Sequence, residues 1–479
     1  MASLFKSFFK RKKGAKASDV NKLSSKTSKV PEIAKPDFET TVLKRDAHNV
    51  SRKDISKNAI KVLYKLNDAG YQSYLVGGGV RDILLGLKPK DFDVATDATP
   101  EQIKSVFRNC RLIGRRFRLA HILFGREVIE VATFRAGHEG SQSELQNNKQ
   151  TRKTAKALTD DDGMLVRDNV YGTLIEDAFR RDFTVNALYY TVQDFTVIDY
   201  TKGLKDLKAK TLRLIGDPVE RYKEDPVRIL RAIRLSCKLN LSIEKKTLEP
   251  IRELSVLLEN ISNARLWEEC NKMLLSGHAE KTWNALYKEG VSNSLFSQTT
   301  HCLKSHDSKT KSKSFNLFIQ SALINTDKRI AIKKSVNPAF LFSVILWAPL
   351  EECVAKLIEK GLSPYDANQK AADQVLNIQR DRVGIPKRFS SMIKEIWTLQ
   401  YRLTILKRKS VLHLLEHPRF RAAYDFLCLR AGENKELKEL SNWWTEFQEL
   451  NSQEKDNILS KVSVQNKNGR KKRKFKTKA

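Results

Sequence analysis

The sequence predicts an α+β protein in which a mixed α/β head, a small twisted sheet with helices, precedes an all-α neck and body. Strand-like and helix-like apolar patterns alternate between about residues 54 and 200, and after about residue 203 helical periodicity continues nearly alone. Both ends are strongly basic: residues 1–35 hold ten Lys/Arg and two Asp/Glu, and residues 467–479 hold eight Lys/Arg and no acid. Stretches of this composition cannot bury a core, so we expect basic disordered termini.

At 479 residues the chain is too long for one hydrophobic core, because domains usually hold about 100–200 residues. Apolar residues make up 41% and charged residues 30%, which excludes a wholly disordered chain. We expect a basic flexible N-terminal arm at 1–40, the head at 41–202, a helical neck at 203–275, a helical body at 276–455 and a basic flexible C-terminal tail at 456–479. These names are used below for the same residues.

The charge of the chain predicts a polyanionic partner. There are 88 Lys+Arg against 56 Asp+Glu, a formal net charge of +32, which favours nucleic acid or an anionic membrane surface. Phe5, Phe8 and Phe9 among the lysines of the arm make weak contact with a membrane surface an alternative. The most apolar stretch, 340–347, is far shorter than the roughly 20 residues of a spanning helix. Six well-separated cysteines favour reduced thiols over a zinc ribbon or a disulfide framework.

The elements of the head follow from local patterns. Ser73–Val76 is a short apolar strand that ends at three glycines. Thr99 is a candidate N-cap before a helix, because Pro100 occupies the first turn and an acid follows it. The remaining predicted elements are a helix over 80–86, a strand over 91–96 and β-rich runs over 111–124 and 127–134.

Glycines between a strand and a helix, followed by two carboxylates, form the first motif. Backbone N–H groups at Gly77 and Gly78 can face an anion at the helix N-terminus, although a tight turn alone needs the same residues. Asp91 and Asp93 stand two apart in a strand, so their side chains share one face. Two adjacent carboxylates repel each other, and a bound hard cation such as Mg²⁺ usually offsets this repulsion.

A second motif, RRDFTVNAL, begins at Arg180. Paired arginines offer bidentate donors to phosphate, and Asp182 and Asn186, four apart, share a helix face. Without further information, a salt-bridged helix start explains the same residues.

A third motif, EDPVRILR, reads as a helix with Asp225 as its N-cap and Pro226 at its first position. Asp225 and Arg228, three apart, point the same way, and such a pair suits the reading of a base: the carboxylate accepts from an exocyclic amine and the guanidinium donates to a ring nitrogen. The pair rejects G and U without separating A from C. Arg231, one turn on, is placed to stack on the base or to brace it. A capped helix with an internal ion pair is the alternative.

Taken together, LVGGGVRDILLG…DFDVAT, RRDFTVNAL and EDPVR resemble the class II branch of the DNA polymerase β-type nucleotidyltransferases, which comprises the bacterial poly(A) polymerases and the CCA-adding enzymes. The resemblance implies a nucleotidyltransferase head that uses two Mg²⁺ ions, with Mn²⁺ as a substitute. It assigns the metal to Asp91 and Asp93, with Glu130 as a third carboxylate and Glu127 as the weaker candidate for that position.

The same resemblance assigns the nucleotide contacts. ATP is a substrate in this family, and no P-loop sequence is present. The implied nucleotide-binding residues are Gly77, Gly78 and Arg81 at the triphosphate, Arg181, Asp182 and Asn186 at the ribose, and Asp225, Arg228 and Arg231 at the base.

Residues 112–122, LIGRRFRLAHI, distinguish the two branches. CCA-adding enzymes usually carry a glycine after the phenylalanine of this segment, whereas Arg118 stands there in this chain, as in bacterial poly(A) polymerases. We therefore expect template-independent addition of AMP from ATP to RNA 3′ ends, with release of pyrophosphate and a role in RNA turnover. A CCA-adding tRNA nucleotidyltransferase and a non-catalytic RNA-binding relative are the alternatives.

The resemblance also implies the partners. We expect the 3′ ends of mRNA and small RNAs, not DNA, as the polymer substrate, RNA-decay and chaperone proteins as partners, and a monomeric enzyme. The expected location is the bacterial cytoplasm, with part of the protein held at the inner membrane if the N-terminal arm contacts it.

Overall fold

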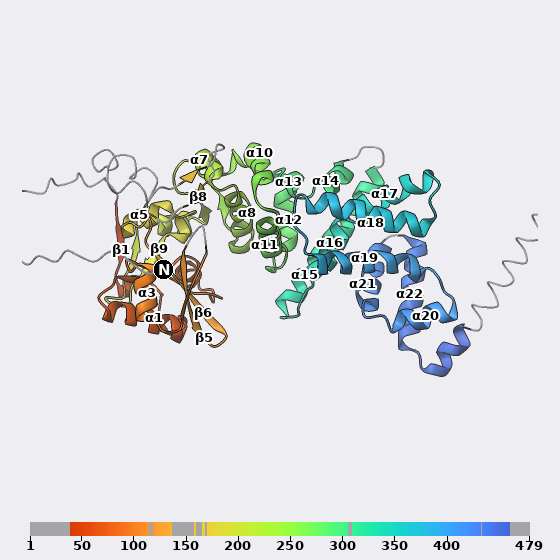
Figure 1. The fold of residues 1–479 in the computed structure, drawn as a ribbon, viewed down its shortest axis with the longest axis horizontal. Coiled ribbons are helices and arrows are strands. Elements are labelled where there is room, and N and C mark those ends of the chain that lie inside the picture. The colour runs from red at the N-terminus through yellow and green to blue at the C-terminus, as the bar shows by residue number, and fades with distance from the viewer. Residues whose placement is uncertain are drawn as a thin grey trace, which may run out of the picture. The chain divides into compact units, whose positions relative to one another are not determined.

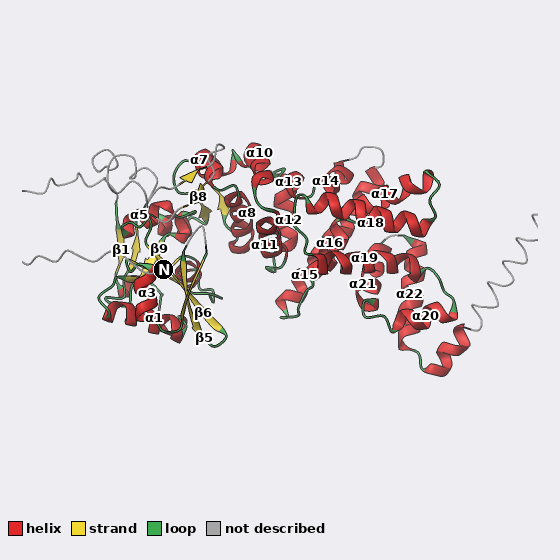
Figure 2. Cartoon of the chain, in the orientation of Figure 1, coloured by secondary structure: helices red, strands yellow, loops and turns green. Residues whose placement is uncertain are grey.

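The computed structural model describes residues 39–114, 118–136, 158–159, 165–167, 170–304, 309–432 and 434–459. The predicted fold class is confirmed, because a mixed sheet with helices precedes a nearly all-helical remainder (Figures 1 and 2). The predictions for the N-terminal arm up to residue 38, for Arg115–Phe117 and for the end of the tail from residue 460 lie outside the described residues.

Eight strands of the described residues form one sheet in the order β1-β10-β9-β2-β3-β6-β5-β4. All neighbours are antiparallel except β3 and β6, which are parallel. The strands of this sheet are β1 (Thr41–Leu43), β2 (Ser73–Val76), β3 (Asp93–Thr96), β4 (Cys110–Ile113), β5 (Leu119–Phe124), β6 (Glu127–Thr133), β9 (Leu188–Tyr190) and β10 (Val197–Asp199). Two minor pairs are β7 (Leu158–Thr159) with β8 (Leu165–Arg167) and β11 (Thr211–Leu212) with β12 (Ser242–Ile243).

Helices cover the sheet on two faces. Leu75 and Val94 belong to the main core, which includes apolar residues of α1 (Lys57–Asp68) and α3 (Pro100–Val106). The alternate residues Val76 and Ala95 belong to a separate cluster with Ala178 of α5 (Leu174–Arg180). Because side chains alternate along a strand, Asp93 lies on the α5 face.

The head also contains α2 (Gly78–Leu84) and the 3₁₀ turn η3 (Thr184–Asn186), and the neck begins with α6 (Gly203–Lys208). The helices that follow are α7 (Pro218–Glu224), α8 (Val227–Leu239), α9 (Lys245–Leu248), α10 (Ile251–Leu254), α11 (Asn263–Leu274), α12 (Ala279–Lys288), α13 (Ser292–Leu295), α14 (Ser297–Lys304), α15 (Lys309–Ala331), α16 (Pro338–Ile345), α17 (Trp347–Glu359), α18 (Pro364–Arg380), α19 (Lys387–Leu403), α20 (Arg408–Leu415), α21 (Phe420–Ala431) and α22 (Lys435–Glu449). None of the described helices is both long and apolar enough to span a bilayer.

Two predicted helix starts can be compared with the structure. Thr99 caps α3 as expected, in a reciprocal capping box with Gln102, and Pro100 is the first helical residue. The start of α8 is displaced by one residue: Pro226 is the N-cap and Asp225 ends α7 instead. The Asp225 carboxylate nevertheless accepts a hydrogen bond from the Val227 N–H at 3.2 Å, so it still satisfies a free donor of the new helix.

Candidate active site

Two of the predicted carboxylates meet at the centre of the sheet. Asp93 pairs in register with Glu130 across the parallel strands β3 and β6. Side chains paired in this way point to one face, so both carboxylates lie on the α5 face. Asp91 lies near enough to act electrostatically on Asp93.

The Asp93 carboxyl resists ionisation. Although the residue keeps an exposed edge, surrounding protein atoms reduce the solvation of its carboxylate, and this burial, followed by repulsion from Glu130, raises the pKa of Asp93 to about 6. Asp91 adds to the rise, while Arg181 and Arg231 oppose it. A cation at this position would relieve the repulsion.

Glu127, the weaker candidate for the third carboxylate, lies on the other face of the sheet. It is three residues from Glu130 in β6 and accepts a hydrogen bond from Asn58 of α1 at 2.5 Å. Glu130 lies between Asp93 of β3 and His121 of β5. The Nε2 atom of His121 lies 3.3 Å from Glu130 Oε1 without hydrogen-bond geometry.

The glycine turn after β2 lies directly beside these carboxylates. Gly77 has φ +73°, which glycine adopts without strain. A Cβ at this position would lie 3.7 Å from Asp93 Oδ2, 3.8 Å from Arg181 Nη1 and 4.0 Å from the Asn186 carbonyl oxygen. The Gly77 turn therefore lies close to Asp93 of the first motif and to Arg181 and Asn186 of the second.

Arg181 is held in place by two residues that the sequence analysis did not identify. Its Nε and Nη2 donate to Asp177 Oδ2 at 3.0 and 2.9 Å, and Nε also donates to the Tyr189 hydroxyl at 2.9 Å. Burial opposes the charge of Arg181, but Asp177 outweighs it, so the pKa of Arg181 is raised. The spacing of four residues between Asp177 and Arg181 could have predicted this ion pair from the sequence. No sequence pattern predicts the contact of Arg181 with Tyr189, which lies on β9.

A hydrogen-bonded chain connects the glycine helix to the neck. Arg81 is buried and donates to Asp82 Oδ1 from Nε at 2.8 Å, while its Nη1 donates to the Asn186 side-chain oxygen. Asn186 donates in turn to Asp182 Oδ1 at 3.0 Å, and Arg231 of α8 donates to Asp182 Oδ2 from Nε at 2.7 Å. Arg81 thus faces Asn186, and Arg231 braces Asp182.

The Arg228 amide donates to the Asp225 carbonyl oxygen at 3.0 Å, but the side chains of these two base-reading candidates bond to other residues. Asp225 Oδ2 accepts from Arg265 of α11 at 2.7 Å. Arg228 donates from Nη1 to Glu224 Oε2 at 2.7 Å and to the Arg221 carbonyl oxygen at 2.6 Å. Glu224, four residues before Arg228, was visible in the sequence as a partner, whereas Arg265 is brought in only by the fold.

Arg118, the residue that distinguishes the two branches, forms an ion pair with Glu101 of α3. Both side chains are largely exposed. Its neighbours Arg115, Arg116 and Phe117 lie outside the described residues.

The fold is shared with solved tRNA-processing enzymes. The Thermotoga maritima CCA-adding enzyme complexed with tRNA superposes with a TM-score of 0.56 and 20% sequence identity, covering 86% of this chain and 88% of that one. An apo tRNA-processing enzyme gives a TM-score of 0.53 at 21% identity, covering 86% and 97% of the two chains. At these identities the likeness concerns the fold alone.

Three family domains match the chain: "Poly A polymerase head domain" at residues 73–213, "Probable RNA and SrmB- binding site of polymerase A" at 240–303, and "Polymerase A arginine-rich C-terminus" at 360–478. The CCA-adding enzyme of Pediococcus pentosaceus is 38% identical over 46% of this chain and 50% of its own length.

The match to poly(A) polymerases extends much further. Poly(A) polymerase I of Salmonella typhimurium is 48% identical over 90% of this chain and 90% of its own length, and that of Haemophilus influenzae is 47% identical over 88% and 91%. Identity at this level over nine-tenths of both chains shows that this chain belongs to the poly(A) polymerase I family.

Proposed function

We propose that the residues around Asp93 transfer AMP from ATP to RNA 3′ ends without a template and release pyrophosphate. The chain is a nucleotidyltransferase of the poly(A) polymerase type. The observation that carries the assignment of the site is the meeting of Asp93, Glu130 and Arg181 at the Gly77 turn. An acidic pair next to an arginine and a glycine turn suits a substrate that brings both phosphates and cations.

The carboxylates fit a divalent metal that arrives with the nucleotide. Repulsion from Glu130 and poor solvation hold the pKa of Asp93 at about 6, and a bound cation would offset both. In the described part of the chain, no three His, Cys, Asp or Glu side chains cluster closely enough to hold a metal by themselves. Mg²⁺ commonly uses one or two carboxylates and completes its shell with substrate phosphates and water, so this arrangement is compatible with it.

We assign Asp91 and Asp93 as the residues that would hold two Mg²⁺ ions, or Mn²⁺ in their place, with Glu130 as the third carboxylate. When bound, such ions activate the attacking hydroxyl and stabilise the leaving pyrophosphate. The protein side chains position the reactants.

We move Arg181 from the ribose, where the resemblance placed it, to the nucleotide phosphates, because Asp177 and Tyr189 orient it toward the Gly77 turn. The amides at Gly77 and Gly78 complete the triphosphate contact. Arg81 is already engaged with Asn186, so we assign it a positioning role at this subsite.

Asp182 and Asn186 are assigned to the ribose. They lie next to each other, and the second oxygen of Asp182 is fixed by Arg231. Arg231 therefore acts through Asp182, and its predicted contact with the base becomes a positioning role.

Asp225 and Arg228 are assigned to adenine. Arg265 holds one carboxylate oxygen of Asp225, and Glu224 holds Nη1 of Arg228, which leaves each group with further hydrogen-bonding capacity. Because this pair accepts cytosine by the same contacts, a rigid arrangement of the pocket must contribute to the preference for A over C.

The four nucleoside triphosphates test the function directly. Each is offered alone with Mg²⁺, once with an oligo(A) primer and once with tRNA that lacks its CCA end. Long tails from ATP alone are expected on the oligo(A) primer. Addition from CTP alone that stops after two C residues on the tRNA would instead assign the chain to the CCA-adding enzymes, and absence of pyrophosphate release would leave a non-catalytic RNA-binding protein.

The roles of the two basic ends and the partners follow from the charge. We propose that the basic arm and the tail help to capture RNA, that the enzyme is a cytoplasmic monomer, and that RNA-decay and chaperone proteins bring it to mRNA and small RNAs. Weak contact of Phe5, Phe8 and Phe9 with the inner membrane remains a prediction, and these residues lie outside the described part of the chain.

A further inference from the structure

We infer that five cations at the start of α12 and the end of α15 form a binding strip for the phosphate backbone of the RNA upstream of its 3′ end. This basic strip consists of Lys281, Lys328, Arg329, Lys333 and Lys334. Residues 328–334 fall outside the three matched family domains. The inference rests on the proposed function, because the ligand is the RNA whose end is extended.

The strip is connected to the active site through a series of contacts. Lys238, at the end of α8, lies 3.7 Å from Asp82 of the glycine helix α2. Lys238 and Lys281 both lie near His278, the residue before α12, and lower its pKa, after burial as the larger cause. Lys238 therefore links α2 to the start of α12, although Asp82 offsets its charge.

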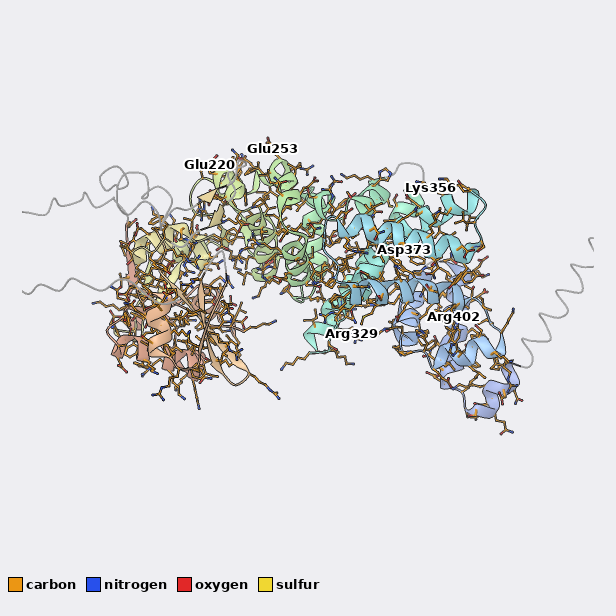
Figure 3. The ribbon with its side chains drawn as sticks, in the orientation of Figure 1. Glu220, Glu253, Arg329, Lys356, Asp373 and Arg402 are labelled. Carbon is orange, nitrogen blue, oxygen red and sulfur yellow. The ribbon has the colours of Figure 1, made fainter. Side chains whose placement is uncertain are left out.

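From α12 the contacts lead directly to α15. Both oxygens of Asp327 accept hydrogen bonds from the first amides of α12, at Ala279 N (2.7 Å) and Glu280 N (3.1 Å). Lys328 and Arg329 follow Asp327 in the chain, so they lie at the junction of the two helices. Figure 3 labels Arg329 at the lower tip of α15.

Two acids adjacent in the chain, Glu280 and Asp327, offset only part of the charge of the five cations. Four of the seven residues from 328 to 334 are cations, and the next acid in the chain is Glu351. The carboxylate of Asp327 is already engaged with α12. Among the described residues, none of the five cations forms an ion pair, whereas Arg382, Arg419 and Lys394 of the body are each paired with a carboxylate.

Stabilisation of the end of α15 explains only part of this arrangement. Lys328 and Arg329 lie in the last turn, where cations favour the helix dipole, and Arg329 also donates to the Ser335 carbonyl oxygen at 3.3 Å. Lys333 and Lys334 lie beyond the helix and are exposed, as is the apolar Ile332 between them and the helix (63% exposed). A solvated end of a helix needs no such cluster.

The partner we commit to is single-stranded RNA, because Lys238 links the start of the strip at α12 to the helix of the triphosphate turn, and because the RNA entering that site is a polyanion. An acidic protein surface is the competing ligand. Sequence-independent contact of this kind should be strongly dependent on salt.

The test variant replaces Lys328 and Lys334 by Gln and Lys333 by Asn; asparagine suits position 333, where φ is +58°. The matched control replaces Lys356, Lys360 and Lys370 by Gln. All three lysines are exposed: Lys356 lies in α17, Lys360 directly follows it and Lys370 lies in α18. Their replacement removes the same charge, and Lys356 is labelled in Figure 3. Binding is measured by fluorescence anisotropy in the absence of ATP, with labelled oligo(A) of about 20 nucleotides and of about four nucleotides, against increasing salt.

For the long oligomer, the test variant should bind several-fold more weakly, and the slope of log Kd against log salt should fall by about 2, roughly 0.7 for each lost phosphate contact. Binding of the four-nucleotide probe and kcat at saturating primer should stay unchanged, and the control should behave like the wild type. If the two triple variants bind the long oligomer equally, or if both probe lengths weaken equally, the strip does not bind upstream RNA. Loss of poly-glutamate binding with intact RNA binding would assign the strip to an acidic protein.

The outcome is independent of the assignment of the reaction. If wild-type protein fails to add AMP but the test variant still loses affinity for the long oligomer, the RNA-binding role of the strip is supported and the proposed reaction is wrong. If wild-type protein adds AMP but the test variant keeps its affinity, only the role of the strip is wrong.

Discussion

Arg231 of the neck donates two hydrogen bonds, from Nε and Nη2, to Asp182 Oδ2 of the head. The Asp182 side chain is 12% exposed, and its other oxygen accepts from the Phe183 amide and from Asn186. One carboxylate therefore joins the 3₁₀ turn η3 of the head to helix α8 of the neck. The geometry of the proposed ribose subsite should therefore depend on the position of the neck.

This carboxylate should stabilise the protein in a pH-dependent way. Burial alone would raise the pKa of Asp182, but Arg231 and the hydrogen bonds outweigh it and hold the pKa well below its usual range. Asp182→Asn should lower the free energy of unfolding by about 2 kcal/mol at neutral pH, the scale of a charge-assisted hydrogen bond. The stabilising effect is present above the unfolded-state pKa of about 3.9 and is lost as the pH falls toward the depressed folded-state pKa.

Urea unfolding of both proteins at several pH values measures this difference. The difference between wild type and variant should be constant from about pH 5 to 8 and should narrow below about pH 4. Glu220→Gln, which removes an exposed carboxylate paired with Lys223, serves as the control and should change little. A difference that grows in acid would contradict the assigned direction of the pKa shift.

The two faces of strand β6 provide a paired test of the metal site. Glu130→Gln should lower kcat by at least about tenfold, because it removes a carboxylate that faces Asp93, whereas Glu127→Gln alters a contact to α1 and should leave kcat near the wild-type value. Asp93→Ala should abolish incorporation of labelled AMP without unfolding the protein. Circular dichroism checks that the variant is folded. Substantial residual activity of Asp93→Ala would show that Asp93 is not a metal ligand.

The conformation of Gly77 predicts a loss of both stability and activity on substitution. Gly77→Ala forces a side chain into φ +73° and should cost about 1–2 kcal/mol of stability, while the new methyl group lies against Asp93 and Arg181. AMP transfer should therefore fall strongly even where the protein is folded.

Gly70→Ala is the matched control. Gly70 has φ +87°, and a Cβ there would have no neighbour within 4 Å. It should lower the melting temperature to a similar degree and keep kcat. Equal losses of activity in both variants would mean that backbone strain alone, and not the proximity of Asp93, causes the effect.

Base selection should depend on Arg228. Arg228→Ala should reduce the preference for ATP over GTP by about tenfold, equivalent to about 1.4 kcal/mol, and should raise the KM for ATP. Arg265→Lys keeps a cation near Asp225 and should affect selection less than Arg265→Met. Competition between ATP and GTP for one primer measures the ratio of AMP to GMP incorporation in each variant. An unchanged ratio in Arg228→Ala would place the adenine elsewhere.

Local signals in the sequence predicted most residues of the candidate site. The spacing of Asp91 and Asp93, the glycine turn at Gly77 and the cap at Thr99 each depend on residues only a few positions apart, because strand alternation, turn geometry and capping are short-range effects. The fold class followed for the same reason. The strong basic excess indicated a polyanionic partner through composition alone, because net charge does not depend on how the chain folds.

Tertiary structure decided which of these residues touch. Glu130 faces Asp93 because β3 and β6 are parallel neighbours, although 36 residues separate them in the chain. Arg231 bonds to Asp182, and Arg265 to Asp225, because helices of the neck pack against distant segments. Local patterns cannot choose between several charged partners of equal chemistry, since the energy of an ion pair depends on distance and burial, which only the packed chain defines.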